Sequence, residues 1–445
     1  MNKTTNFVNY LNLAEVAIGF KSISTDPAYK PEIEKTVVWF KNLFDQNGFR
    51  VSVWSTKTSN PVILASYALN PKAETVMVYG HYDVQPATKE DGWKSDPFRL
   101  HNDGKRLYGR GVIDNKGQVL IHISTIIDLI KTGKLKYNVK FLLEGNEETS
   151  NPDLAGLMKL HKTDLACDLF MISDGELTNN KPTIEVSLRG GFNCTLVYQT
   201  GKNNLHSGIY GGAVPNAAHE LVKFLSGLHD QHGQVTYPEF YVDADTISNQ
   251  ELVNNRNLDS NETTTAKLAG VARLLKKPNT DFYTQTGLIP TIQITGIKTG
   301  YIGEGYANIV TAIAEARLNF RIVTSQNPEK VFADFEKYVK NLTPKYVSYQ
   351  LIIHGEHKPI KINTNSPNMI EAEKILARVY KTKPVKKYVG GALPIVAEVK
   401  EILGVDSLLI PLVNEDCNMH GANENFDLKF VHKALEFSRE FFSTA

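Results

Sequence analysis

The sequence predicts an α/β domain, with a central mixed sheet flanked by helices, that is interrupted by an inserted α+β domain. Over roughly the first 190 residues, short apolar segments alternate with segments of helical periodicity, which is typical of a sheet covered on both faces. Residues 309–323 then alternate strictly between apolar and polar, as a strand with one buried face does. After about residue 360 the first pattern returns. We therefore expect residues 1–191 and 356–445 to form one domain and residues 192–355 to form the inserted one.

The elements of the first domain follow from the spacing of apolar residues. Residues 31–47 have helical spacing, and Gly48 follows as a C-terminal stop. A second helix is expected over 118–131, before Gly133. The short apolar segments that we expect to be strands are 51–54, 62–67, 75–79, 139–143 and 169–172. The last part of the chain adds helices over 369–380 and 394–403, a strand over 407–412, and a final helix through Phe442.

The inserted domain has a different pattern, with strands expected over 192–198, 309–323 and 347–354 and helices over 216–229 and 331–342. In the alternating strand, one side should face the core, and it comprises Ala314, Ala316, Leu318, Phe320 and Ile322. Residues 237–290 are polar and rich in Asn, and no element is assigned to them.

Composition and charge exclude several classes of protein. The chain has 445 residues, with 49 Lys+Arg against 48 Asp+Glu, which argues against nucleic-acid binding through bulk charge. Three cysteines without a C-x-x-C pair argue against a disulfide framework or a thiolate zinc finger. Glu15 interrupts the apolar stretch 13–20, so no signal peptide is expected, and the apolar run 119–130 is too short to span a bilayer. We expect a cytoplasmic protein without nucleic-acid or membrane partners.

Acidic and histidine residues follow four of the predicted strands, and one more lies in a glycine-rich loop. In open α/β sheets, ligands bind beyond the carboxyl ends of the strands, so these side chains should converge. Two histidines with three or more carboxylates suit zinc, manganese or cobalt. The residues concerned are His81, Asp83, Asp114, Glu147, Glu148, Asp174, Glu176 and His420.

Each of these residues taken alone has a structural explanation. A lone histidine after a strand more often forms ordinary hydrogen bonds, a Glu-Glu pair is usually solvated, and Asp114 could cap the helix that begins near Gly117. The convergence of five such segments at one edge of a sheet favours a metal site. Glu147 and Glu148 would repel each other, and a divalent cation beside one of them relieves that repulsion and leaves the other free to transfer protons.

Five segments, HYDVQP, GRGVIDNKG, EGNEE, ISDG and MHG, resemble in sequence and order those of the M20 zinc metallopeptidase family. The dipeptidase branch, of the cytosolic non-specific dipeptidase and carnosinase type, is the most similar. The resemblance spans His81 to His420. It implies a catalytic domain interrupted by a lid domain through which two copies form a homodimer. It also implies a small peptide substrate and two divalent metal ions, zinc first, with manganese and cobalt as alternatives.

The resemblance implies a ligand set for each ion. His81, Asp114 and Asp174 would bind one ion. Asp114, Glu148 and His420 would bind the other, so that Asp114 bridges the two. The peptide bond after Asp114 would be cis.

It also implies how the reaction proceeds. An activated hydroxide that bridges the ions would be the nucleophile, and Glu147 would be the general base. Asp83 would accept a hydrogen bond from His81 and fix its tautomer.

Further implied roles fall in or near the inserted domain. His206, within LHSGIYGG, would stabilise the oxyanion in the neighbouring subunit, and Arg321 would bind the substrate carboxylate. Asn308 would contact the substrate. The backbone N–H groups of Gly391 and Ala392 could hold an anion, although relatives often have Ser in place of Ala392. Without the resemblance, His206 is a turn histidine and Arg321 a solvent-facing arginine.

The leading hypothesis is a di-zinc peptidase that hydrolyses dipeptides or short peptides. The alternative is an N-acyl-amino-acid deacylase or desuccinylase with the same metal chemistry. In the family, Asp at position 174 accompanies aminopeptidase or dipeptidase activity and Glu accompanies deacylases and carboxypeptidases; Glu176 would be the ligand if the register were shifted. A non-catalytic binding protein would lack a ligand or the base, and neither is missing.

Overall fold

The computed structural model describes residues 3–258, 261–275 and 280–444, and the chain divides by its contacts into two units. The first unit comprises Met1–Val186, Ile362–Lys386 and Glu398–Ala445, and the second comprises Ser187–Lys361 and Lys387–Ala397. Three segments that we expected in the first domain therefore group with the second unit, namely residues 187–191, 356–361 and 387–397.

The main sheet is mixed, as predicted. Its parallel part consists of β6, β3, β7 and β17, and antiparallel pairing adds β2 beside β6 and β8 beside β17. The nine strands run in the order β1 (Arg50–Trp54), β2 (Val62–Tyr67), β6 (Asn138–Glu144), β3 (Thr75–His81), β7 (Leu169–Ile172), β17 (Ser407–Leu409), β8 (Thr183–Leu188) and β15 (Ile360–Lys361), with β16 (Val385–Val389) paired to β8. The predicted strand over 407–412 is shorter in the structure, because it leaves the ladder after Leu409.

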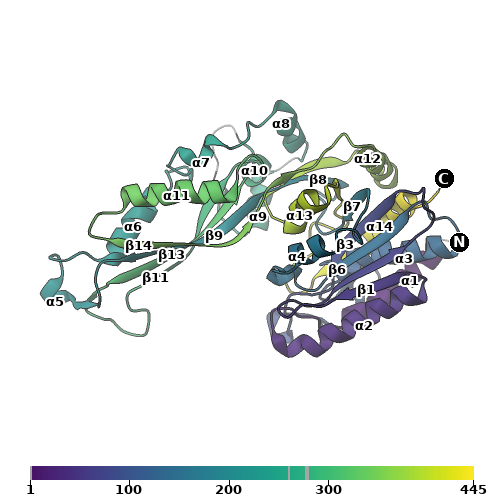
Figure 1. Ribbon diagram of the computed structural model, residues 1–445, viewed down its shortest axis with the longest axis horizontal. Coiled ribbons are helices and arrows are strands. Elements are labelled where there is room, and N and C mark those ends of the chain that lie inside the picture. Colours follow the sequence, from purple (N-terminus) through teal and green to yellow (C-terminus); the bar gives the residue numbers. More distant parts are fainter. Residues whose placement is uncertain (1–2, 259–260, 276–279, 445) are drawn as a thin grey trace. The chain divides into compact units, whose positions relative to one another are not determined.

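Helices pack against this sheet and against one another (Figure 1). The central helix α3 (Lys116–Lys131) contacts β3 as well as α1 (Lys3–Gly19) and α14 (Leu428–Phe442), and it is buried along nearly its whole length. Helix α2 (Lys30–Gln46) packs on β1 and β2, and α12 (Pro367–Tyr380) packs on α14. The shorter helices are α4 (Leu154–Leu160) and α13 (Pro394–Leu403). None of the described helices is both long and apolar enough to cross a membrane.

Parallel pairing brings the carboxyl ends of four strands to one edge of the sheet. His81 at the end of β3 lies opposite Glu144 at the end of β6. Ile172 at the end of β7 is the partner of both Tyr79 and Leu409. The segments that follow β3, β6, β7 and β17 therefore begin side by side, at the edge where open α/β sheets bind their ligands.

The second unit contains a four-stranded antiparallel sheet in the order β11 (Thr291–Thr299), β13 (Ile313–Ile322), β9 (Gly190–Gln199) and β14 (Ser348–His357). Helices α6 (Ala217–Gly227) and α11 (Pro328–Leu342) contribute to the core on one face of this sheet (Figure 1). The core side of β13 is the predicted one, because all five of its expected apolar residues are buried.

The single strand expected over 309–323 is wrong at its start. Residues Ile309–Val310 form a separate strand, β12, which pairs with β10 (Leu205–His206), and β13 begins only at Ile313. The sequence does not reveal this break, because apolar residues continue through it at every second position, and Val310 and Ala312 are buried as the core residues of β13 are. Thr311 between them is buried as well, which departs from the alternation.

The unassigned segment 237–290 consists largely of short helices, although residues 259–260 and 276–279 lie outside the described part. The helices are α7 (Glu239–Val242), α8 (Asn249–Arg256), α9 (Glu262–Leu268) and α10 (Phe282–Gly287). Ser248, Asn261 and Asp281 cap three of these helices with their side chains. Its polar composition is thus partly explained by capping, which apolar periodicity does not reveal.

Candidate metal centre

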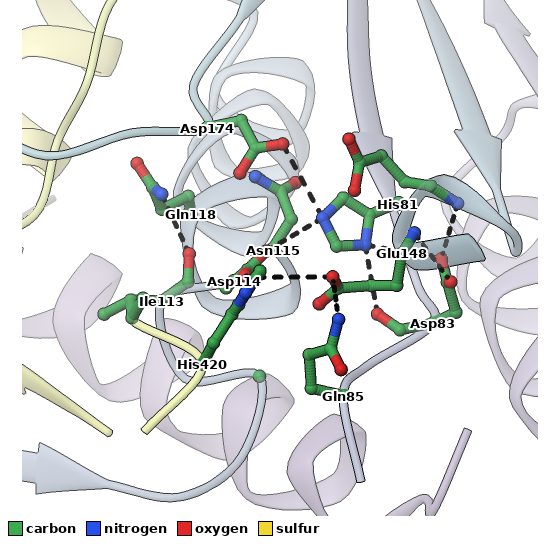
Figure 2. Close-up of polar contacts among 12 residues, drawn as sticks. His81, Asp83, Gln85, Ile113, Asp114, Asn115, Gln118, Glu148, Asp174 and His420 are labelled. Carbon is green, nitrogen blue, oxygen red and sulfur yellow. Dashed lines mark hydrogen bonds and ion pairs between the residues drawn. The ribbon is translucent and has the colours of Figure 1, made fainter. Parts of the chain in front are cut away.

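The side chains that follow the four parallel strands meet around Asp114, which precedes helix α3 (Figure 2). One ligand atom from each of His81, Asp114 and Asp174 lies within 4.8 Å of the others. Ligand atoms of Asp114, Glu148 and His420 satisfy the same criterion. The structure therefore brings together the two predicted ligand groups, which share Asp114.

The two oxygens of Asp114 face different histidines. Its Oδ1 lies 2.9 Å from Nε2 of His81, and its Oδ2 lies 2.8 Å from Nε2 of His420. Asp174 is 3.6 Å from Nε2 of His81, and Glu148 is 3.3 Å from Nε2 of His420. Each side of the Asp114 carboxylate thus has one histidine and one further carboxylate, the arrangement that a bridging ligand requires.

Asp83 orients two parts of this centre. Nδ1 of His81 lies 3.0 Å from the backbone carbonyl oxygen of Asp83 and 3.4 Å from its carboxylate, so the carbonyl is the nearer acceptor. A hydrogen on Nδ1 leaves the lone pair of Nε2 directed at Asp114 and Asp174. The Asp83 carboxylate accepts from the backbone N–H groups of Glu147 and Glu148, each at 3.2 Å. The side chain of Asp83 therefore fixes the turn after β6, whereas its carbonyl fixes His81.

Glu147 and Glu148 begin the short 3-10 helix η3 (Glu147–Thr149) after β6. Gln85 donates to Oε2 of Glu148 at 2.7 Å and so holds the carboxylate that faces His420 (Figure 2). Burial raises the pKa of Glu147 to about 8, and the negative charges of Asp174, Asp114 and Asp83 contribute to this rise. The carboxyl group of Glu147 is therefore close enough to the proposed ligands for their negative charges to raise its pKa.

The residues of the centre fit divalent cations on electrostatic grounds. Burial raises the pKa of Asp174 to about 7, and the negative charge of Asp114 adds to it. Asp114 is also buried, but hydrogen bonds from His420 and His81 hold its pKa well below the usual range. Buried carboxylates at this density need positive charge beside them. Imidazole nitrogens and carboxylate oxygens are donors that zinc, manganese and cobalt accept.

The loop that carries Asp114 is held from several sides. Its peptide bond to Asn115 is cis, which confirms the expectation. The side-chain amide of Asn115 donates to the carbonyl oxygen of Ser173, one residue before Asp174, at 2.7 Å. At Gly117 any Cβ would lie 1.7 Å from the carbonyl oxygen of Val112, so only glycine fits where the loop enters α3.

Of the two candidate ligands in this segment, Asp174 and Glu176, the structure places Asp174 at the centre. Glu176 accepts from Sγ of Cys417 at 3.0 Å and forms a β-bridge with Val413. Within the described residues, the ligand groups include Asp174 and not Glu176.

Several residues that support the centre were not predicted. Gln85 lies within the HYDVQP segment, but nothing in that segment distinguishes it from a surface glutamine. Lys116 is fully buried and donates to the carbonyl oxygens of Ala17 and Phe20 near the end of α1, which a sequence pattern cannot reveal. His122 is buried between the hydroxyls of Ser438 and Ser173, and the latter residue directly precedes Asp174.

The other predicted site residues lie in the second unit. His206 is exposed at the end of β10, and its Nδ1 accepts the backbone N–H of Gly208 at 3.0 Å. Asn308 is adjacent, because its carbonyl oxygen accepts the N–H of Ser207. Because Nδ1 of His206 accepts a hydrogen bond, the hydrogen of the neutral imidazole is on Nε2, which can donate it to another group.

Arg321 lies near a second arginine that was not predicted. Its Nε donates to the neutral side chain of Asn319 at 3.1 Å. Burial lowers the pKa of Arg189 to about 10, and the positive charge of Arg321 acts in the same direction. Arg189 donates to the carbonyl oxygen of Gly390 at 3.0 Å, which places it beside the turn that contains the exposed Gly391 and the half-buried Ala392.

Comparison with known proteins agrees with this centre. Residues 77–444 match the family described as Peptidase family M20/M25/M40. The Beta-Ala-His dipeptidase of Rattus norvegicus is 29% identical over 82% of this chain and 76% of its own length. The Cys-Gly metallodipeptidase DUG1 of Candida albicans is 27% identical over 94% of this chain and 91% of its own length.

A solved structure is similar over nearly the whole of both chains. It is that of the M20 family metallo-carboxypeptidase Sso-CP2 from Sulfolobus solfataricus, with a TM-score of 0.87, 28% identity, and coverage of 97% of this chain and 98% of that one. Because the family match covers well over half of its residues, the chain belongs to peptidase family M20/M25/M40 and is a metal-dependent hydrolase.

Proposed function

We propose that the chain is a dipeptidase that uses two divalent ions, most often zinc, bound on either side of Asp114. The observation that carries the proposal is the Asp114 carboxylate, whose two oxygens face His81 and His420 separately. The dipeptidase names of its relatives support the substrate class.

The chain's own residues would divide the work of hydrolysis. When bound, two divalent ions would polarise the scissile carbonyl and lower the pKa of a water molecule. Glu147 would take the proton from the attacking water and later deliver it to the leaving amine. Burial makes Glu147 a stronger base than an exposed glutamate, and positive charge at the neighbouring ligands would bring its pKa back toward neutrality.

Recognition of the substrate would come from the second unit. Arg321 would bind the free carboxylate of the dipeptide, for which a planar guanidinium has the appropriate geometry. Its Nε already contacts a neutral amide, and burial lowers the pKa of Arg321. Burial also lowers the pKa of Arg189, and the positive charge of Arg321 adds to that effect, so a substrate carboxylate would relieve the repulsion between the two arginines. Asn308 and the backbone N–H groups of Gly391 and Ala392 are proposed as further contacts.

A homodimer formed through the second unit would complete the site. His206 presents an Nε2–H donor on an exposed segment, where it could stabilise the oxyanion in a neighbouring copy. Large apolar residues are exposed on the same segment, on the loop that precedes β12, and at the start of β13, as expected of a contact surface; they are Ile209, Tyr210, Tyr301, Ile302, Tyr306 and Ile313.

A carboxypeptidase activity is a second candidate, because the similar solved structure is of a metallo-carboxypeptidase. In a dipeptide, both activities cleave the same bond and both need the terminal carboxylate. They differ in whether the amino end of the substrate must be free. The family's deacylases would go further and prefer a blocked amino end.

Substitutions at Asp114 and Glu147 should separate metal binding from proton transfer. Asp114→Ala should lose bound zinc and dipeptide hydrolysis together, because it removes a ligand from both ions. Glu147→Gln should retain its zinc, while kcat falls by about 10²–10⁴-fold, the usual contribution of a general base. Elemental analysis and initial rates on the same samples provide the measurement. Unchanged zinc content and hydrolysis in Asp114→Ala would refute the proposed centre.

A substrate panel should identify the activity. We expect the free dipeptide to be hydrolysed faster than its N-acetylated form and faster than its C-terminal amide. In Arg321→Met the preference over the amide should shrink by about 10–100-fold, since a charged hydrogen bond contributes about 1.5–3 kcal/mol. Faster hydrolysis of the N-acetylated form would favour the carboxypeptidase or deacylase instead. An unchanged preference in Arg321→Met would exclude that residue as the carboxylate contact.

Mixed dimers should reveal whether His206 acts across subunits. His206→Ala and Glu147→Gln should each be nearly inactive alone. After the two are mixed and allowed to exchange subunits, about a quarter of the wild-type activity should return, because half of the dimers are mixed and each contains one intact site. Recovery is measured against each variant mixed with itself. If the mixture regains no activity while light scattering shows dimers that exchange, His206 does not act in the neighbouring copy.

A further inference from the structure

Arg110 and Glu424 form a buried ion pair that the proposed reaction does not use. Nη1 of Arg110 lies 2.6 Å from Oε2 of Glu424, and their side chains are 3% and 0% exposed. The two residues are separated by 314 positions in the sequence. Replacing such a pair by apolar residues is often neutral for stability, so its presence requires another explanation.

The Glu424 carboxylate is bound to the loop that carries Asp114. It accepts the backbone N–H groups of Gly111 at 3.1 Å, Ile113 at 3.0 Å and Asp114 itself at 3.3 Å. Three converging amides fix the path of the backbone into Asp114. The direction in which its two oxygens point therefore depends on Glu424.

The Arg110 guanidinium is bound to the loop that carries His420. Its Nη2 donates to the carbonyl oxygens of His420 at 3.1 Å, Gly421 at 3.3 Å and Pro86 at 3.4 Å. Pro86 follows Gln85, the residue that holds Glu148. His420 has a φ of 59°, a conformation that residues other than glycine rarely adopt, so its backbone needs such external contacts.

We propose that the Arg110–Glu424 pair is a positioning device that sets the separation and orientation of Asp114 and His420 for the ion they share. This inference rests on the proposed metal centre and adds residues that touch neither ion nor substrate. The pair joins three segments that supply or support ligands, and each of its members binds the backbone of one ligand. Charge is needed because each group must satisfy several polar backbone groups at once.

Glu424→Gln tests the inference, and Asp128→Asn is its matched control. Both substitutions remove the charge of a buried acid paired with an arginine in the first unit. Asp128 and Arg439 join α3 to α14 instead of joining ligand loops. Co²⁺ binding is measured by competition with a chelator, together with the visible absorption spectrum of the Co²⁺-loaded chain and the thermal midpoint of the chain without metal.

We expect Glu424→Gln to raise the dissociation constant for Co²⁺ by about 10–100-fold and to change the Co²⁺ spectrum, as loss of outer contacts to ligands does. Asp128→Asn should lower the thermal midpoint and leave affinity and spectrum unchanged. Equal affinity of Glu424→Gln and wild type, or an equal loss in Asp128→Asn, would overturn the inference while leaving the proposed function intact. A wild-type chain that binds no Co²⁺ would overturn the metal centre itself.

If Glu424→Gln does not fold, Arg110→Lys decides the matter. Lysine keeps the positive charge beside Glu424 but lacks the planar fork through which Nη1 contacts Glu424 while Nη2 contacts the three carbonyl oxygens. We expect Co²⁺ affinity to fall by about tenfold or more. An unchanged affinity in this variant would overturn the inference.

Discussion

The structure of the first unit depends on one constraint: the two oxygens of Asp114 must face two histidines that come from distant parts of the chain. His81 ends a central strand, and His420 lies in a loop near the end of the sequence. The parallel pairing of β3, β6, β7 and β17 brings the segments that follow these strands to one edge of the sheet. The buried carboxylates gathered there repel one another, and bound cations would relieve that repulsion.

The parts of this arrangement that follow from local patterns could be predicted from the sequence. Short apolar strands followed by His81, Glu148 and Asp174 were enough to predict both the sheet and the edge at which the ligands gather. The strict alternation in β13 predicted which side faces the core, and the structure agrees. Both predictions depend only on residues that are close in sequence.

What could not be predicted depends on partners far away in the chain. Nothing in the sequence distinguishes Arg110 and Glu424 from other charged residues, because their ion pair depends on a contact between segments that are 314 positions apart. Helix α1 and the strands β8, β11 and β16 were missed, and the short helices of 237–290 depend on caps at Ser248, Asn261 and Asp281. The break before β13 was also missed, because buried residues continue across it.

The proposed function depends on two ions that share the Asp114 carboxylate. Anomalous diffraction at the zinc absorption edge, from crystals of the zinc-loaded chain, tests it most directly. We expect two peaks about 3.5–4 Å apart, one on each side of Asp114, with His81 beside one and His420 beside the other. A single peak, or two peaks that do not share Asp114, would contradict the account.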